Sequence, residues 1–369
     1  MKALILSCST GEGHNSAAYA LKEELDDKNI LTNIIDPISF VSEKMKNNVS
    51  EGYNNLIRKA PKLFGVIYNL GKFYDNLNLP SPIYYLNKKY ALDLFQYITE
   101  NKYDFVISTH IFGMEALTAI RKIYNPDIKF YGILTDYTSI PFYKDTILDG
   151  YFITHNNVAE ELVKKNIDNK KIYVTGIPVS KKFNTSISKK KAKRRLGIPL
   201  NKKLISITSG GAGAGKIYQL ANRIDNNLDD KYLIYIFVGK NVKLKNKLIN
   251  KFQDNKRIKI ISFTKDINIY YIASDLVFSK PGGLSSTEIA VSNVLFVHLR
   301  AIPGCETANI KYFTKNGLSL KGRYNYTAVR AMKKLLNDDS LARNMLLNQK
   351  RLINKNSQEL IINQILSEL

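Results

Sequence analysis

The chain has 369 residues, 44% of them apolar, which exceeds what one hydrophobic core usually supports and excludes a disordered protein, so we expect two domains. The 55 lysines and arginines outnumber the 32 acidic residues, and the formal net charge of +23 favours a polyanionic partner: nucleic acid, anionic lipid or a phosphorylated substrate. No apolar run fits a membrane span or a signal peptide, and the two cysteines predict neither a disulfide framework nor a metal site, so we expect a cytoplasmic protein.

Strand and helix candidates alternate along the first half of the chain, which is typical of a parallel sheet. The strand candidates are 3–7, 33–36, 104–109, 130–135, 150–154 and 171–178, and the helix candidates are 16–25, 114–120 and 158–165. The alternation starts again at 204–208, after a basic stretch. The sequence therefore predicts an α/β protein with two doubly wound domains that face each other across a cleft, at 1–180 and 199–345, joined by an exposed basic linker at 181–198.

A glycine turn follows the first strand candidate, in STGEGHNSAA at 9–18. We expect a helix capped by Asn15 or Ser16 to come directly after His14. The turn lacks the third glycine of a dinucleotide fingerprint, so we expect neither NAD nor FAD. At the carboxyl edge of a sheet, the His14 imidazole is suited to take a proton at neutral pH; the alternative is a ring that only bonds loop backbone.

A second glycine loop, SGGAGAGKI at 209–217, follows the strand candidate at 204–208. Its glycines allow consecutive backbone N–H groups to point at an anion near a helix N-terminus, which predicts a phosphate site. The spacing up to Lys216 fits a phosphate loop, but Ile217 stands where Ser or Thr must bind Mg²⁺. The alternative is a tight turn with no ligand.

Five segments in chain order carry a resemblance to a known family. They are STGEGHNSAA, TDYTSIPF at 135–142, TGIPV at 175–179, SGGAGAGKI, and the block from KPGGLSSTEIA to PGCETAN at 280–309. Together they resemble the lipid glycosyltransferases that include monogalactosyldiacylglycerol synthases and processive diacylglycerol glucosyltransferases, in glycosyltransferase family 28. The peptidoglycan undecaprenyl-linked N-acetylglucosaminyltransferase is a more distant relative. The resemblance implies the GT-B architecture, with the lipid acceptor on the first domain, the UDP-sugar on the second, and a C-terminal helix at 346–369 that returns to the first.

The resemblance also implies a donor site. The second glycine loop holds the diphosphate, so no Ser or Thr is needed at 217. Backbone at Phe263 and Thr264 holds uracil, and Glu288 binds the ribose hydroxyls, although Ser285 and Glu288 also fit a capping box. Glu306 and Asn309 bind the hexose. The donor-binding residues implied are Gly13, Ser209, Gly210, Gly211, Gly213, Phe263, Thr264, Gly282, Gly283, Ser285, Glu288, Glu306 and Asn309.

For the chemistry, the resemblance implies that His14 is the general base. Asp136 is expected to orient His14 or to replace it, with a turn cap as the alternative, and His110 and His155 are secondary candidates. The Asp-x-Asp signature of the other large glycosyltransferase fold is absent, so we expect no metal and no cofactor. Cys305 stands where relatives usually carry Gln, which puts the accepted hexose in question.

Residues 41–90 mix aromatic and apolar side chains with cations, which suits a reversible contact with an anionic membrane; the alternative is a helical excursion packed on the first domain. The cations expected at this membrane and acceptor surface are Arg58, Lys59, Lys62 and Lys72. The predicted protein is an inverting hexosyltransferase that uses UDP-glucose or UDP-galactose and diacylglycerol, on the inner face of the cell membrane. The alternatives are the undecaprenyl-linked N-acetylglucosaminyltransferase, a UDP-sugar epimerase, and a nucleic-acid-binding module, for which we find no signature.

Overall fold

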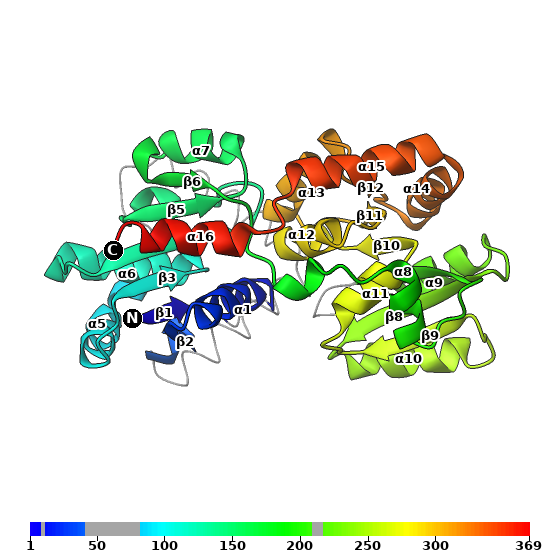
Figure 1. Cartoon of the computed structure of the whole chain (residues 1–369), viewed down its shortest axis with the longest axis horizontal. Coiled ribbons are helices and arrows are strands. Elements are labelled where there is room, and N and C mark those ends of the chain that lie inside the picture. Colours follow the sequence, from blue (N-terminus) through cyan, green and yellow to red (C-terminus); the bar gives the residue numbers. More distant parts are fainter. Residues whose placement is uncertain (9–11, 41–81, 209–216) are drawn as a thin grey trace. The chain divides into compact units, whose positions relative to one another are not determined.

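The computed structural model describes residues 1–8, 12–40, 82–208 and 217–369, which form two compact units (Figure 1). The first unit comprises Met1–Ser180, Ile302–Ala308 and Asn356–Leu369. The second comprises Lys181–Ala301 and Asn309–Lys355. The chain therefore crosses from one unit to the other more than once, and its last helix belongs with its first strand.

The first unit is built on a six-stranded parallel sheet in the order β2-β1-β3-β4-β5-β6. Its strands are β1 (Lys2–Leu6), β2 (Leu31–Ile35), β3 (Phe105–Ser108), β4 (Lys129–Ile133), β5 (Gly150–Ile153) and β6 (Ile172–Val174). Its helices are α1 (Glu12–Asp27), α4 (Pro82–Lys88), α5 (Ala91–Glu100), α6 (Ile111–Tyr124), α7 (Asn156–Val163) and α16 (Ser357–Leu366). Most strand residues are apolar and buried because helices cover both faces of the sheet.

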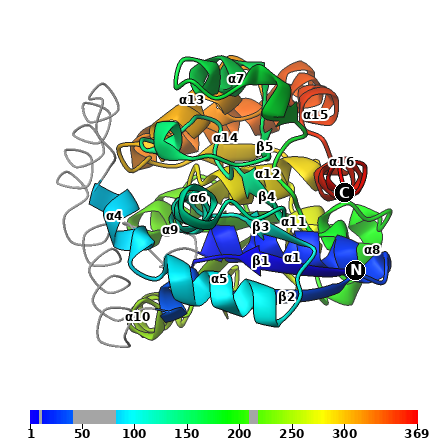
Figure 2. The same ribbon diagram turned by 90° about the vertical axis from the view of Figure 1, so that its left-hand side faces the viewer.

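The two faces of this sheet have separate cores. Leu21 of α1 and Ile361 of α16 pack with Ile107 on one face, and Leu94 of α5 and Leu117 of α6 pack with Val106 on the other. Figure 2 shows α1 and α16 on one side of β1, β3 and β4, with α5 and α6 on the opposite side. The alternating inward and outward side chains of the strands produce this division.

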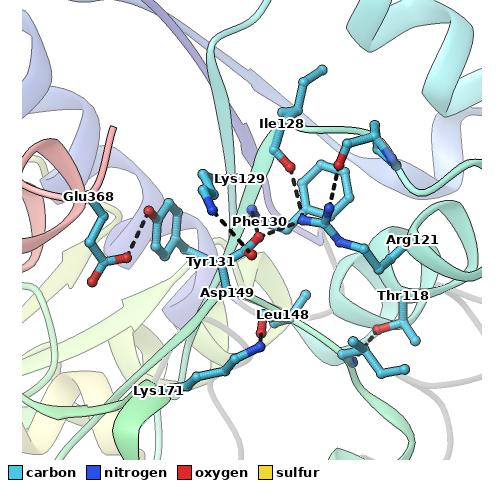
Figure 3. A network of polar contacts seen from close by, with 12 residues as sticks. Thr118, Arg121, Ile128, Lys129, Phe130, Tyr131, Leu148, Asp149, Lys171 and Glu368 are labelled. Atoms are coloured by element: carbon cyan, nitrogen blue, oxygen red, sulfur yellow. Dashed lines mark hydrogen bonds and ion pairs between the residues drawn. The ribbon is translucent and has the colours of Figure 1, made fainter.

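The end of the chain is attached to the first sheet by polar contacts as well as by packing. The carboxylate of Glu368 accepts hydrogen bonds from the hydroxyls of Tyr131 in β4, at 3.0 Å, and Tyr173 in β6, at 2.6 Å. Figure 3 shows Glu368 beside Tyr131, and it also shows Asp149 held by Arg121. These contacts join α16 to two strands far away in the sequence.

The second unit has a second six-stranded parallel sheet, in the order β12-β11-β10-β7-β8-β9. Its strands are β7 (Lys203–Thr208), β8 (Tyr232–Gly239), β9 (Ile258–Ser262), β10 (Leu276–Ser279), β11 (Phe296–His298) and β12 (Leu320–Lys321). Its helices are α8 (Lys189–Arg195), α9 (Ile217–Asp225), α10 (Val242–Phe252), α11 (Ile267–Ala273), α12 (Gly283–Val291), α13 (Cys305–Lys315, which begins in the first unit), α14 (Asn325–Asn337) and α15 (Asp339–Leu352). Two doubly wound α/β units with parallel sheets are thus confirmed.

The basic stretch that we interpreted as an exposed linker has a different structure. Residues 189–195 form helix α8, which belongs to the second unit, and Ala192 is fully buried. The carboxylate of Asp275 forms ion pairs with Lys189 Nζ, at 3.1 Å, and with Lys193 Nζ, at 3.4 Å. A carboxylate 82 positions along the chain from Lys193 therefore compensates part of the local charge.

The segment expected as a single C-terminal helix at 346–369 contains the end of α15 and the whole of α16. The two helices are separated at 353–356, where the chain passes from the second unit to the first. Among the residues that the structure describes, no helix combines the length and the apolar character needed to cross a bilayer.

Candidate active site

His14 lies inside α1, and not before it as we expected. The helix begins at Glu12, so Asn15 and Ser16 are within its first turns and do not cap it. Asn15 has another contact: its side-chain oxygen accepts a hydrogen bond from Ser7 Oγ at 2.7 Å. This bond ties the start of α1 to the segment that follows β1, and it helps to fix the position of His14.

The protonation of the His14 ring follows from its neighbours. Nδ1 lies 2.8 Å from the backbone carbonyl oxygen of Thr109, which only accepts hydrogen bonds, so Nδ1 carries the proton. Thr135 Oγ1 lies 3.1 Å from the same nitrogen. In the neutral ring Nε2 then keeps its lone pair. The site therefore presents His14 as a base that accepts through Nε2.

Burial supports the neutral form of this ring. It lowers the pKa of His14 from the ordinary 6.5, and the hydrogen bond to the Thr109 carbonyl opposes that effect. His14 nevertheless remains partly exposed to solvent. A neutral imidazole with an accessible side is what general-base catalysis requires near pH 7.

His110 is the nearest aromatic neighbour of His14, with ring centroids 4.6 Å apart in an edge-to-face arrangement. It is the N-cap of α6, and its Nδ1 accepts a hydrogen bond from the Phe112 backbone N–H at 3.2 Å. Burial, and then the charge of His14, lowers the pKa of His110 well below 6.5. His110 is therefore a neutral capping residue that packs against His14.

Asp136 follows β4, next to the residue that contacts His14. The contact from this segment to Nδ1 of His14 comes from Thr135, while the carboxylate of Asp136 hydrogen-bonds the thiol of Cys305. Burial, with Asp136 next in size, raises the pKa of Cys305 well above its ordinary value, so the sulfur stays protonated. His155 caps α7, and its Nε2 lies 3.3 Å from the Tyr137 carbonyl oxygen.

In the second unit, a Pro-Gly-Gly turn leads from β10 into α12. The N-cap of α12 is Gly282, which has no side chain to form a capping hydrogen bond. Ser285 lies inside the helix and is not its N-cap, so the capping box between Ser285 and Glu288 is not formed. Ser285 Oγ instead approaches the Gly282 carbonyl oxygen at 3.4 Å. A Cβ on Gly282 would lie 3.0 Å from that hydroxyl, so this turn fits glycine closely.

Because the capping box is not formed, the carboxyl group of Glu288 does not serve to start the helix. Burial raises its pKa from 4.5 to about 8, and the nearby Lys182 partly opposes that shift. The carboxyl group is mostly protonated at neutral pH when nothing is bound, and a protonated carboxyl both donates and accepts hydrogen bonds. A buried acid of this kind is typical of a functional site.

Two other residues expected at the donor site already make contacts within the protein. Asn309 is fully buried, and its side-chain nitrogen donates to the Pro281 carbonyl oxygen at 3.0 Å, which holds the turn before α12. Glu306, in the first turn of α13, accepts a hydrogen bond from the Ile302 backbone N–H at 2.7 Å. The structure thus gives Asn309 a role in positioning the Pro-Gly-Gly turn.

Phe263 and Thr264 directly follow β9. Phe263 is 58% exposed, and Lys240 Nζ lies 5.4 Å from the centre of its ring. Thr264 Oγ1 accepts from the Asp266 backbone N–H at 3.1 Å. Both backbones stand at the carboxyl edge of the second sheet, where ligands of doubly wound folds bind.

His298 is a buried residue for which the sequence predicts no role. It ends β11, and its ring nitrogens lie 2.8 Å from Ser286 Oγ and 2.9 Å from Ser319 Oγ. Burial lowers its pKa to about 3, so the ring is neutral. The only signal for this role was the presence of histidine inside an apolar strand; its two serine partners lie elsewhere in the chain.

Several expected residues lie outside the described part of the chain. They are Ser209, Gly210, Gly211 and Gly213 in the donor site, and Arg58, Lys59, Lys62 and Lys72 at the membrane surface. Gly13 is described and lies in the first turn of α1, and Gly283 opens α12. Within the described residues, no cluster of His, Cys, Asp or Glu side chains is arranged to hold a metal ion.

Comparison with known proteins links both halves of the chain to glycosyltransferases. Residues 14–179 match the monogalactosyldiacylglycerol (MGDG) synthase family, and residues 204–365 match the glycosyltransferase family 28 C-terminal domain. A processive diacylglycerol beta-glucosyltransferase of Staphylococcus aureus is 24% identical over 350 residues, which cover 94% of this chain and 87% of the relative.

Solved structures with the same fold include MurG and a UDP-sugar epimerase. MurG of Acinetobacter baumannii superposes with a TM-score of 0.66 at 14% identity, covering 99% of both chains. The UDP-N-acetylglucosamine 2-epimerase of Neisseria meningitidis, bound to UDP-GlcNAc, has a TM-score of 0.65 at 14% identity and full coverage of both chains. At such low identity these likenesses show the fold alone, and that fold is GT-B.

Proposed function

The chain belongs to the lipid glycosyltransferase family of monogalactosyldiacylglycerol synthases and processive diacylglycerol glucosyltransferases, and from this premise we propose that it transfers glucose or galactose from a UDP-sugar to diacylglycerol at the cytoplasmic membrane face. Family membership makes it a UDP-sugar-dependent glycosyltransferase, and the diacylglycerol acceptor is proposed from the names of the relatives. The hexose, the membrane face and the roles of single residues are the proposed part.

The observation that carries the proposed mechanism is the contact between His14 Nδ1 and the Thr109 carbonyl oxygen. It leaves Nε2 of the neutral ring free to accept a proton from the acceptor hydroxyl. As that proton moves to Nε2, the hydroxyl oxygen forms a bond to the anomeric carbon. The bond from this carbon to the diphosphate breaks, and its electron pair leaves with UDP. Attack opposite the leaving group converts an α-linked donor into a β-glycoside.

We propose that the second unit holds the departing UDP with backbone groups. The N-terminus of α12 directs unpaired N–H groups and a positive dipole toward the Pro-Gly-Gly turn, an arrangement that favours anions. Glu288 is the proposed ligand of the ribose hydroxyls. Phe263 and Thr264 are proposed to hold uracil through their backbone, and Ser209, Gly210, Gly211 and Gly213 to hold the diphosphate. With these donors, we propose that the transfer needs no metal ion.

Other parts of the proposal rest on sequence pattern and chemistry. Asp136 is proposed to orient His14 or to replace it as the base, and its carboxylate also accepts a hydrogen bond from the Cys305 thiol. Glu306 is proposed to bind the hexose. Arg58, Lys59, Lys62 and Lys72 are proposed to attract the anionic membrane that contains the acceptor.

The GT-B fold is shared by enzymes that use other acceptors, so the acceptor must be tested directly. Radiolabelled UDP-glucose, UDP-galactose and UDP-N-acetylglucosamine are offered in turn with diacylglycerol vesicles, and the lipid products are separated. A labelled hexosyl diacylglycerol from one of the first two donors supports the proposal. Transfer of N-acetylglucosamine to a polyprenyl diphosphate acceptor alone, or conversion of the UDP-sugar without any acceptor, contradicts it.

A further inference from the structure

Helix α10 carries a basic surface on the second unit that the proposed chemistry does not use. Residues 240–259 contain eight lysines and arginines and a single acidic residue, Asp254. Of the eight, Arg257 is ion-paired with Asp225 at 2.6 Å. The four lysines of α10 itself have no carboxylate within ion-pair distance among the described residues, and they are Lys243, Lys245, Lys247 and Lys251.

Two exposed aliphatic side chains accompany these lysines. Val242 is 64% exposed and Ile249 is 43% exposed. They are seven positions apart in the helix, so both stand on the same side of it, two turns from each other. Leu248 and Phe252 are buried on the side that faces the sheet. On the exposed side of α10, Val242 and Ile249 therefore lie on one flank, and Lys243, Lys247 and Lys251 lie on the other.

The helix that carries this surface is firmly placed in its unit. The side chain of Asn241 caps it by accepting from the Leu244 backbone N–H at 2.9 Å. Lys247 Nζ lies 4.6 Å from the ring centre of Tyr218 in α9, which holds the stem of this lysine against the unit. Figure 1 shows α10 at the lower margin of the second unit, beside β8 and β9. The surface is thus held in place by contacts within its own unit.

We propose that the α10 surface, defined by Val242, Ile249 and the four lysines of the helix, docks the second unit on an anionic lipid bilayer. Lysines near a negatively charged leaflet are attracted to it, and aliphatic side chains enter the boundary between headgroups and acyl chains. Nucleic acid is also negatively charged, but Val242 and Ile249 are neither aromatic nor polar, so they can neither stack on its bases nor form hydrogen bonds with them. The inference goes beyond the proposed function, because it concerns a contact of the second unit and holds whichever hexose is transferred.

The test measures binding of the full-length protein to vesicles by flotation. Vesicles of phosphatidylcholine with about a third phosphatidylglycerol are compared with pure phosphatidylcholine. Lys243→Glu/Lys247→Glu/Lys251→Glu is expected to weaken binding to the anionic vesicles about tenfold or more. The matched control is Arg330→Glu/Lys333→Glu/Lys334→Glu, the same charge change at exposed positions of α14, and it should bind within about twofold of the unchanged protein.

A second variant tests the apolar part. Val242→Ser/Ile249→Ser keeps every charge, and we expect it to weaken vesicle binding several-fold while binding to a single-stranded oligonucleotide stays unchanged. If the serine variant binds vesicles normally, or if both triple variants lose binding equally, the α10 surface is not a bilayer contact. Transfer to diacylglycerol in detergent micelles is measured separately: its absence would reject the proposed function without affecting the vesicle result.

Discussion

The Nδ1 atom of His14 lies 2.8 Å from the carbonyl oxygen of Thr109, which is 95 positions further along the chain. The two residues meet because Thr109 follows β3, the strand next to β1 in the sheet, and α1 starts at the same edge. The backbone carbonyl selects the ring tautomer without any carboxylate. That Asp136 orients His14 or replaces it stays a prediction.

His14→Ala is therefore expected to lower the rate of sugar transfer by about 10² to 10⁴, since general-base catalysis contributes an effect of that size. The affinity for UDP should remain within about twofold, because the change removes a proton acceptor and not a nucleotide contact. Steady-state rates and calorimetric UDP titration measure the two quantities. A variant with near-normal turnover would remove His14 from the mechanism.

The pH dependence of kcat/KM provides a second test of the same ring. The active form of His14 is neutral, and burial lowers its pKa below 6.5. Activity should therefore be constant around pH 7 and decline only as the pH falls through a midpoint below 6.5. Rates from about pH 5 to 8 at saturating diacylglycerol would give this midpoint. An acid limb centred above 7 is incompatible with a buried neutral base.

Glu288 predicts that the stability of the protein falls as the pH rises. Its pKa is raised from 4.5 to about 8, so its favourable effect on stability is complete below pH 4.5 and is lost as the pH rises through 8. Glu288→Gln carries no charge at either pH, so it does not suffer this loss. The gain in its free energy of unfolding over the unchanged protein should be larger at pH 9 than at pH 5, by on the order of 2 kcal/mol. Urea unfolding at the two pH values measures the difference.

The same position is expected to matter for the nucleotide. Glu288→Ala should weaken UDP binding about tenfold or more, and Glu288→Gln should weaken it less, because the amide keeps one acceptor and a donor pair. Glu359→Gln, at an exposed position of α16, is the control. Equal affinities for UDP in all three variants would exclude Glu288 from the ribose site.

The architecture could be predicted from the sequence because each strand is a short apolar run between turn residues. The helical character of 189–195 could not, since its neutralising partner Asp275 comes from a distant part of the chain. For the same reason Thr109 and Thr135 were missed as partners of His14. The sequence predicts them as the last residues of two strands, but the atoms that they present to the ring depend on how the chain turns after each strand.

Asn309 illustrates the limit of assigning a role by position in a motif. The motif predicts a contact with the sugar, which stays a prediction, and the structure adds a bond from the buried side chain to the backbone of Pro281. A backbone partner leaves no trace in the sequence, because every residue has a carbonyl oxygen. His298 shows the same limit, since the serines on either side of its ring are ordinary hydroxyl residues until the fold brings them together.

The contact of Glu368 with Tyr131 and Tyr173 makes a final prediction about the end of the chain. Burial, and then Glu368 itself, raises the pKa of Tyr131, so its hydroxyl keeps its proton and donates to the carboxylate. Glu368→Ala leaves that buried hydroxyl without this acceptor and should destabilise the first unit by about 1 to 3 kcal/mol, visible as a lower melting temperature. Glu359→Ala, at an exposed position of α16, should change it little. If the two variants melt together, α16 is held by the packing of its isoleucines alone, and the carboxylate contributes nothing to its attachment.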